Sequence, residues 1–282
     1  MIRRNSFYLY ALMLFVLSGS LAYAQKAPKI KGNRIVAPYS APIDAFHSLV
    51  LDQDINLNIM ASDSSSVSMI ADDNLPPIFK FEVRDSVLHI STYYRITAAK
   101  QLDMTLHTPR LDLITISEGN LGITLDPRFK STEIRMSGNA SAAIVGTIPS
   151  LRVSGDEKSF VNISGAFEVL HLSLLDRSTA TIYGDISSTA QLNMEARASA
   201  KWGGTLAFLT ASLSGATQLE AADLIIEEAS VHAAGKSKLD LQLSAHLTYF
   251  ATEESQLDLF GTPRIDLLDF SGTAELRKKQ LK

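Results

Sequence analysis

The 282-residue chain contains no cysteine and only one tryptophan, and its basic residues do not outnumber its acidic ones. The lack of cysteine excludes disulfides, thiolate metal sites and a cysteine nucleophile. With 26 Lys and Arg against 30 Asp and Glu, the formal net charge is −4. Proteins that bind nucleic acid usually present a basic face, so this balance predicts no nucleic-acid partner.

Long apolar runs are missing after Ala24. Residues 1–24 have the pattern of an export signal: Arg3 and Arg4 precede the apolar run Phe7–Leu17, and a small-x-small cleavage site precedes Gln25. The run is too short to span a bilayer comfortably, although an uncleaved anchor is the alternative. The sequence therefore predicts an exported protein, in the periplasm, on the outer-membrane surface or outside the cell, with no transmembrane span after cleavage.

A short polar step, often Ser-Gly, recurs at nearly constant spacing through the second half of the chain. The nine steps begin at Glu118, Ser137, Ser154, Asp176, Ala196, Ser214, Ala234, Thr252 and Ser271. Self-similarity at a period of about 19 residues is the signature of a solenoid. Between the steps lie short runs of β-forming residues, such as Leu239–Leu243. The sequence therefore predicts an all-β fold, a parallel (right-handed) β-helix of about nine rungs.

The rest of the chain frames this repeat. Residues 25–42 contain three prolines and are interpreted as a flexible lead-in, and residues 43–110 as an N-terminal strand-rich part. Solenoid rungs are predicted over 111–276. Residues 277–282 form a basic tail that we expect to keep the terminal rung from pairing with another strand. At the steps themselves, Gly215 and Gly235 are predicted to adopt positive φ, because a tight bend often requires it.

Motifs that carry chemistry are absent from the sequence. It has no Gly-x-Ser-x-Gly elbow and no Walker or dinucleotide-binding glycine pattern. Its six histidines never form the spacings typical of zinc ligands. The sequence therefore predicts no catalytic residues, no metal site, no cofactor and a non-enzymatic role.

One set of side chains is a candidate binding site. Counting six residues past successive steps gives Trp202, Glu220, Asp240 and Asp258. Equal offsets stack along one face of a β-helix, so the three carboxylates are predicted to form an exposed column with Trp202 on the next rung. This column is either a solvated acidic face or a surface that binds a sugar or a cation. By the same count, Phe160 and Ile182 extend the column as an apolar strip.

With these features the chain resembles the putative auto-transporter adhesin, head GIN-domain family, which is common in Bacteroidetes. The resemblance covers about residues 43–270. It is carried by the strand after Phe46, Val87–Ile90, Thr108–Leu111, the Ser-Gly steps, and Phe260–Pro263. It implies an exported parallel β-helix with an N-terminal strand-rich portion, and it brings no established catalytic residues. The chain departs from the Ser-Gly pattern in its middle rungs, at the steps that begin at Asp176 and Ala196.

Three functional classes remain open. The first is a cell-envelope or surface protein that binds glycan or another protein along one side of the solenoid. The second is a polysaccharide lyase or hydrolase of the β-helix type that uses Glu220, Asp240 and Asp258. The third is a structural spacer without a ligand. Enzymes of this shape concentrate Arg, Lys, His and paired acids in one groove, whereas here Arg and Lys are scattered. The first class is therefore favoured.

Overall fold

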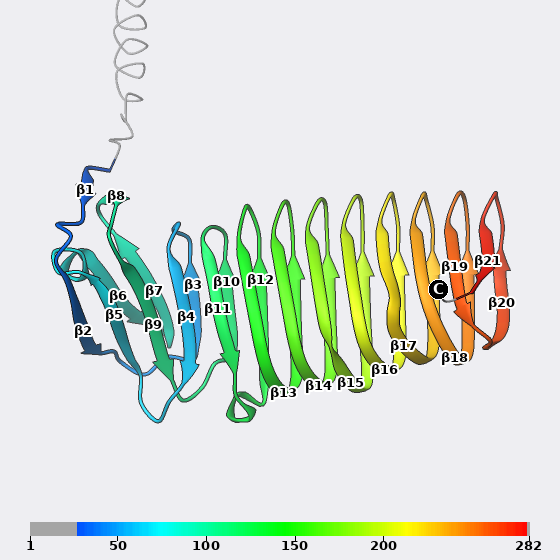
Figure 1. Cartoon of the computed structure of the whole chain (residues 1–282), viewed down its shortest axis with the longest axis horizontal. Helices are drawn as coiled ribbons and strands as arrows, with labels where there is room; N and C mark the ends of the chain where they lie inside the picture. Colours follow the sequence, from blue (N-terminus) through cyan, green and yellow to red (C-terminus); the bar gives the residue numbers. More distant parts are fainter. Residues whose placement is uncertain (1–26, 281–282) are drawn as a thin grey trace, which may run out of the picture.

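The computed structural model describes residues 27–280, and the predicted export signal (residues 1–24) lies outside them. The described part is an elongated β-solenoid of about nine turns (Figure 1). Its only helices are two short 3-10 turns, η1 (Pro76–Ile78) and η2 (Pro127–Phe129). The predicted all-β, parallel solenoid is therefore confirmed.

The strands fall into an N-terminal group and a repeating group. The N-terminal strands are β1 (Lys29–Lys31), β2 (Val36–Pro42), β3 (Ser48–Leu51), β4 (Asn56–Ala61), β5 (Ser66–Asp72), β6 (Phe79–Arg84), β7 (Val87–Thr92), β8 (Arg95–Ala98) and β9 (Leu102–Thr108). The repeating strands are β10 (Leu113–Ile116), β11 (Asn120–Leu125), β12 (Ser131–Met136), β13 (Ser141–Gly155), β14 (Phe160–Leu174), β15 (Thr179–Met194), β16 (Ser199–Leu213), β17 (Gln218–Ala233), β18 (Lys238–Ala251), β19 (Gln256–Gly261), β20 (Arg264–Phe270) and β21 (Glu275–Lys279).

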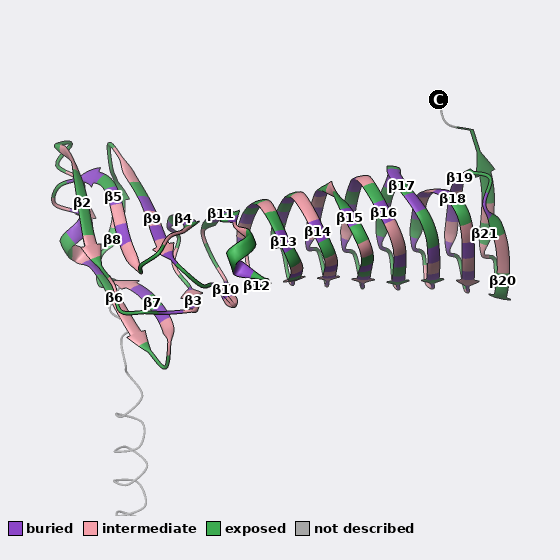
Figure 2. Cartoon of the chain, turned by 90° about the horizontal axis from the view of Figure 1, so that it is seen from below, coloured by how far each residue is buried: buried purple, intermediate pink, exposed green. Residues whose placement is uncertain are grey.

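Each of the long strands β13 to β18 contributes to two sides of the solenoid. The first half of β13 pairs with β11 and its second half pairs with β12, both in parallel. Side chains alternate between the interior and the solvent, as the banded colouring of Figure 2 shows. Inward residues stack rung on rung into one continuous core, for example Ile163, Ile182 and Trp202. Burial of this apolar stack is the main stabilising contribution in a chain without disulfides.

The corners of the solenoid are fixed by residues with positive φ. At nearly even intervals along the chain they are Gly119, Gly138, Glu157, Asp176, Ala196, Gly215, Gly235, Glu253 and Gly272. The predicted positive φ is confirmed for Gly215, at 83°, and for Gly235, at 72°. A Cβ on Gly215 would lie 2.7 Å from the backbone oxygen of Ala196 on the preceding rung. The corner backbone is thus both left-handed and tightly stacked.

The predicted positions of the middle corners are wrong by one or two residues. Gly155 has no positive φ; it ends β13 and pairs with Leu174, and the corner follows two residues later at Glu157. Ala196 is the corner residue of its rung, and it stacks on Gly215 of the next rung. The sequence pattern instead pairs Ala196 with Ser214. Without a glycine to mark these corners, the sequence pattern placed them one or two residues away from their true positions.

The N-terminal part belongs to the same continuous stack. β10 pairs with β12 on one side and with β3 on the other, and β11 likewise lies between β13 and β4. On their far sides, β3 pairs with β7 and β4 with β9. The rung built from β3 and β4 therefore lies between two other rungs. One is built from β7 and β9, which precede residue 111, and the other from β10 and β11, which follow it. The predicted boundary at residue 111 does not mark a change of architecture.

The interpretation of residues 25–42 as a flexible lead-in is also wrong for the described residues. Within it, β2 pairs antiparallel with β5 along its whole length, and β5 pairs antiparallel with β9. β2 is an edge strand, and this explains how it accommodates Pro38 and Pro42, which lack an N–H to donate. The antiparallel strands cover the N-terminal end of the solenoid.

The C-terminal end is arranged differently. β20 pairs only with β18 and β21 only with β19 in the described part of the chain. Residues 277–279 of the predicted basic tail are part of β21, so the tail begins as a strand. On β20, Leu267 and Phe270 continue inward-facing columns but are half-exposed because no described strand covers them.

Candidate functional site

The predicted carboxylate column exists. Glu220, Asp240 and Asp258 occupy matching positions on β17, β18 and β19, three successive rungs in parallel register. Their neighbours Leu219, Leu239 and Leu257 point into the core. Because side chains alternate along a strand, the three carboxylates share the outer face. Their role in binding stays a prediction.

Trp202 does not belong to this column, and its prediction as an exposed aromatic is wrong. It is 1% exposed and stacks on buried Ile182 inside the solenoid. The residue that aligns with Glu220 is Lys201. The error comes from the corner at Ala196. The six-residue offset takes Ala196 as equivalent to Ser214, whereas Ala196 aligns with Gly215. A shift of one residue moves a strand side chain to the opposite face.

The predicted apolar strip beyond Trp202 is absent for the same reason. The displaced count selected Ile182, whose side chain is fully buried. Phe160 is partly exposed, but it aligns with Thr179 and lies outside the column. The column residue on that strand is Asn162, two positions later. Asn162 aligns with Thr181, which in turn aligns with Lys201. The outer column therefore continues with polar side chains.

Cations lie at both ends of the carboxylate column. Lys201 precedes Glu220, and Arg277 of β21 aligns with Asp258. Arg277 Nε donates to Asp258 Oδ1 at 2.5 Å, and Lys279 Nζ lies 3.6 Å from Asp258 Oδ2. The predicted basic tail thus neutralises the last carboxylate of the column, in addition to any role at the end of the solenoid.

Asp240 is the carboxylate with the most unusual environment in the column. Partial burial raises its pKa, and the neighbouring charges of Asp258 and Glu220 raise it further, against the opposing effect of Arg277. A small cleft of about 170 Å³ lies here. It is lined by Gln218, Leu219, Lys238, Leu239, Asp240, Gln256, Asp258 and Arg277. The column therefore combines acidic and basic groups in one shallow, polar depression.

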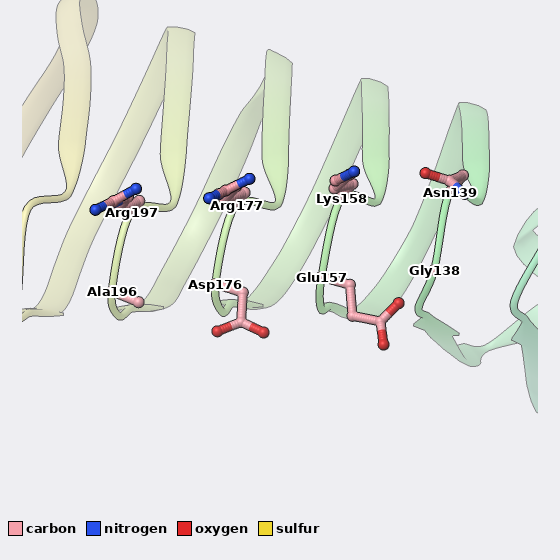
Figure 3. Close-up of a pocket in the computed structure, with 8 residues that line it drawn as sticks. All are labelled: Gly138, Asn139, Glu157, Lys158, Asp176, Arg177, Ala196 and Arg197. Atoms are coloured by element: carbon pink, nitrogen blue, oxygen red, sulfur yellow. The ribbon is translucent and has the colours of Figure 1, made fainter.

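A second charged feature lies at the corners of the middle rungs. An open hollow of about 610 Å³ follows four consecutive corners, lined by Gly138, Asn139, Glu157, Lys158, Asp176, Arg177, Ala196 and Arg197. We call Lys158, Arg177 and Arg197 the basic row. Figure 3 shows the three cations side by side along the solenoid, with the carboxylates of Glu157 and Asp176 in a separate row.

The basic row was missed because the phase of the middle corners was misassigned. In the correct phase each of these corners is a left-handed residue followed by a cation: Glu157-Lys158, Asp176-Arg177 and Ala196-Arg197. Two of these pairs were already visible as departures from Ser-Gly. The signal was therefore present in the sequence, but Glu157-Lys158 is recognisable only once Gly155 is excluded as a corner.

In the part of the chain that the structure describes, no group of three or more His, Asp or Glu residues is placed to hold a metal ion. Across those same residues, no helix is both long and apolar enough to cross a membrane. His246 and Asp266 pair at 2.9 Å on the outer surface of β18 and β20.

A parallel β-solenoid with in-register charged columns on its outer surface is the architecture of a protein that presents a long, rigid side to its surroundings. The family model described as "Putative auto-transporter adhesin, head GIN domain" matches residues 45–263. The chain belongs to this family, as the resemblance in its sequence indicated. No curated protein matches the chain.

Solved structures share the fold. A putative adhesin from Parabacteroides distasonis superposes with a TM-score of 0.65 at 14% identity, covering 89% of this chain and 100% of its own. A putative adhesin from Parabacteroides merdae superposes with a TM-score of 0.54 at 16% identity, covering 90% of this chain and 100% of its own. A structure from P. distasonis named as a putative lipid binding protein superposes with a TM-score of 0.53 at 16% identity. It covers 89% of this chain and 99% of its own. At these identities the likeness establishes the fold alone.

Proposed function

We propose that this protein is an exported, non-enzymatic cell-envelope or surface protein that binds glycan or another surface protein along one side of its solenoid. The family and two of the related structures are named as putative adhesins, which supports a surface protein rather than an enzyme. The observation that carries the proposal is the stacking of outward side chains in register over successive rungs. Such stacking presents a repeating ligand with the same chemistry at a constant spacing of about 4.8 Å.

The carboxylate column is one part of this side that the proposal assigns to binding. Glu220 and Asp240 present oxygens that accept hydrogen bonds from sugar hydroxyls, and Lys201 and Arg277 supply donors beside them. Because Trp202 is buried, it offers no plane for a sugar ring to stack on. Binding at the column would therefore rely on polar contacts. We expect Asp240→Asn to weaken it.

Export is proposed from residues 1–24, whose charged start, apolar run and small-x-small site fit a cleaved signal. We predict that the chain recovered from its native cell begins at Gln25. N-terminal sequencing or intact mass measurement tests this, and recovery of a chain that still carries Met1 or Arg3 would contradict it. Fractionation of the same cells distinguishes periplasm, outer-membrane surface and medium.

A glycan-array screen combined with a reducing-sugar release assay on the mature chain tests the binding role. We expect retention of one or more glycans without release of reducing ends. Release of reducing ends would instead support the polysaccharide lyase or hydrolase alternative, with Glu220, Asp240 and Asp258 as the acids. If the chain binds no glycan, releases no reducing ends and binds no surface protein of the same cell, the spacer alternative is favoured.

A further inference from the structure

We propose that the basic row, Lys158, Arg177 and Arg197, is a binding site for an acidic glycan, a polysaccharide that carries carboxylate or sulfate groups along its length. This inference rests on the proposed function and assigns it a site and a ligand class. All three side chains are exposed and stand at the same position of three consecutive corners.

The backbone holds the row in a fixed arrangement. Lys158 N–H donates to the carbonyl oxygen of Gly138 at 3.0 Å, Arg177 N–H to that of Glu157 at 2.9 Å, and Arg197 N–H to that of Asp176 at 2.7 Å. Each cation is therefore anchored to the preceding rung by the corner itself. Their backbone positions repeat about every 4.8 Å. An extended polyanion can follow such a row without reorganising the protein, so little backbone ordering opposes binding.

The cations of the basic row have no neutralising partner in the described part of the protein. Among residues 27–280, none of the three cations forms an ion pair. The situation changes farther along the solenoid, where Ala216 interrupts the row and Lys236 pairs with Glu254 at 3.3 Å. Like charges on neighbouring rungs repel one another. A bound anionic chain removes this repulsion.

The shape and chemistry of the hollow favour a glycan over a nucleic acid. It is an open depression of about 610 Å³ whose lining includes Asn139 and no aromatic residue. Single-stranded nucleic acid is usually bound through aromatic planes on which bases stack, and duplexes require a larger basic face than three residues. The planar guanidinium groups of Arg177 and Arg197 suit carboxylate and sulfate, to which arginine can donate two parallel hydrogen bonds.

Affinity chromatography and titration with defined polymers test the proposal. The probes are dextran sulfate and polygalacturonate, which distinguish sulfate from carboxylate recognition, with neutral dextran and duplex DNA as comparisons. We expect binding to at least one acidic polysaccharide that weakens as salt rises, because exposed charges are screened. Replacing the row by Lys158→Gln, Arg177→Gln and Arg197→Gln should lower the affinity by roughly tenfold or more, since each exposed ion pair contributes modestly.

A matched variant controls for net charge. Lys29→Gln, Arg95→Gln and Lys100→Gln remove three exposed cations that lie outside the row, and this variant should bind like the wild type. Unchanged melting temperatures show that both variants fold. The proposal is overturned if the row variant binds as tightly as the control, if neutral dextran binds equally well, if duplex DNA is preferred, or if no acidic polysaccharide binds. A chain that binds neutral glycans on the array but no acidic one retains the proposed function and loses this inference.

Discussion

At the residue scale, the corners show how one backbone position accepts different side chains at different cost. Gly215 and Gly235 adopt positive φ without a Cβ clash, whereas Glu157, Asp176 and Ala196 adopt φ between 54° and 62° as non-glycine residues. A left-handed conformation costs an L-residue about 1–2 kcal/mol. The middle corners, which carry the basic row, are therefore strained, as is the later corner at Glu253.

We predict opposite effects for reciprocal substitutions at aligned corners. Gly215→Ala should lower the free energy of unfolding by about 1–2 kcal/mol, because it places a Cβ in the left-handed region. Ala196→Gly should raise it by up to about 1 kcal/mol, the relief of strain being partly offset by the greater freedom of glycine in the unfolded chain. Urea unfolding measures both. Equal midpoints for the two variants would show that the corners carry no such strain.

Asp240 gives a prediction with a defined pH dependence. Its pKa is raised by burial and by the charges of Asp258 and Glu220, so ionisation of Asp240 destabilises the folded chain. This penalty is present above the ordinary aspartate pKa of 3.8 and disappears as the pH falls below it. Asp240→Asn should therefore raise the melting temperature slightly at pH 7 and leave it nearly unchanged near pH 3. Destabilisation at pH 7 would contradict this account.

At the element scale, Asp72 joins the antiparallel strands that cover the N-terminal end. Its carboxylate accepts hydrogen bonds from the backbone N–H groups of Arg34 and Lys100, both at 3.1 Å. Burial by itself raises its pKa, but the backbone N–H groups of Lys100, Arg34 and Gln101 and the charge of Lys100 together outweigh burial and hold the pKa below its ordinary value. The ionised group thus connects the loop before β2 to the loop between β8 and β9.

We predict that Asp72→Asn destabilises the protein at pH 7. Because the folded-state pKa of Asp72 is depressed, its stabilising contribution is present above pH 3.8 and is lost as the pH falls through the folded value. The difference between variant and wild type should therefore shrink in acid. Asp44→Asn, at an exposed site, is the control. Melting curves at pH 7 and pH 3 decide the matter, and a pH-independent difference would count against this role.

The last strand, β21, carries a lysine at an inward-facing position. Lys278 aligns with buried Leu259, so it stands at the open end of the core column. Inward-pointing charges on edge strands discourage further pairing, consistent with the role expected of the basic tail. We predict that Lys278→Val causes concentration-dependent self-association in sedimentation experiments, and that Lys236→Val, at a corner, does not. A Lys278→Val chain that sediments like the wild type would remove this role.

The sequence reveals the repeating elements better than the non-repeating ones. The near-constant spacing of the polar steps, the β-type runs and the glycine corners at Gly215 and Gly235 were sufficient to predict the solenoid. The antiparallel pairing of β2 with β5 joins segments that have no periodic relation, and β2 contains prolines that suggest a loop. Contacts of this kind leave no periodic pattern in a single sequence.

The candidate sites follow the same division. Where glycine marks the corner, as at Gly215 and Gly235, counting from it placed Glu220 and Asp240 correctly in register. Where Ala196 forms the corner, the count was displaced by one residue and selected Trp202, a core side chain. Because burial alternates with every residue, a displacement of one position is enough to exchange a surface residue for a core residue.

At the scale of the whole molecule, different surface features lie at different points along the solenoid. The N-terminal end is covered by antiparallel strands, the middle rungs carry the basic row, and the C-terminal rungs carry the carboxylate column with its neutralising cations. Rungs stacked by continuous backbone ladders hold these features at fixed separations. A protein of this form suits recognition of an extended partner.

The most direct test of this account is a crystal structure of the mature chain bound to a short sulfated or uronate oligosaccharide. We predict that the ligand lies along the middle corners, with its anionic groups contacting Lys158, Arg177 and Arg197 on consecutive rungs and its chain running along the solenoid axis. An acidic oligosaccharide bound across a single rung, at the carboxylate column or at an end of the solenoid would contradict the assignment of this ligand to the basic row.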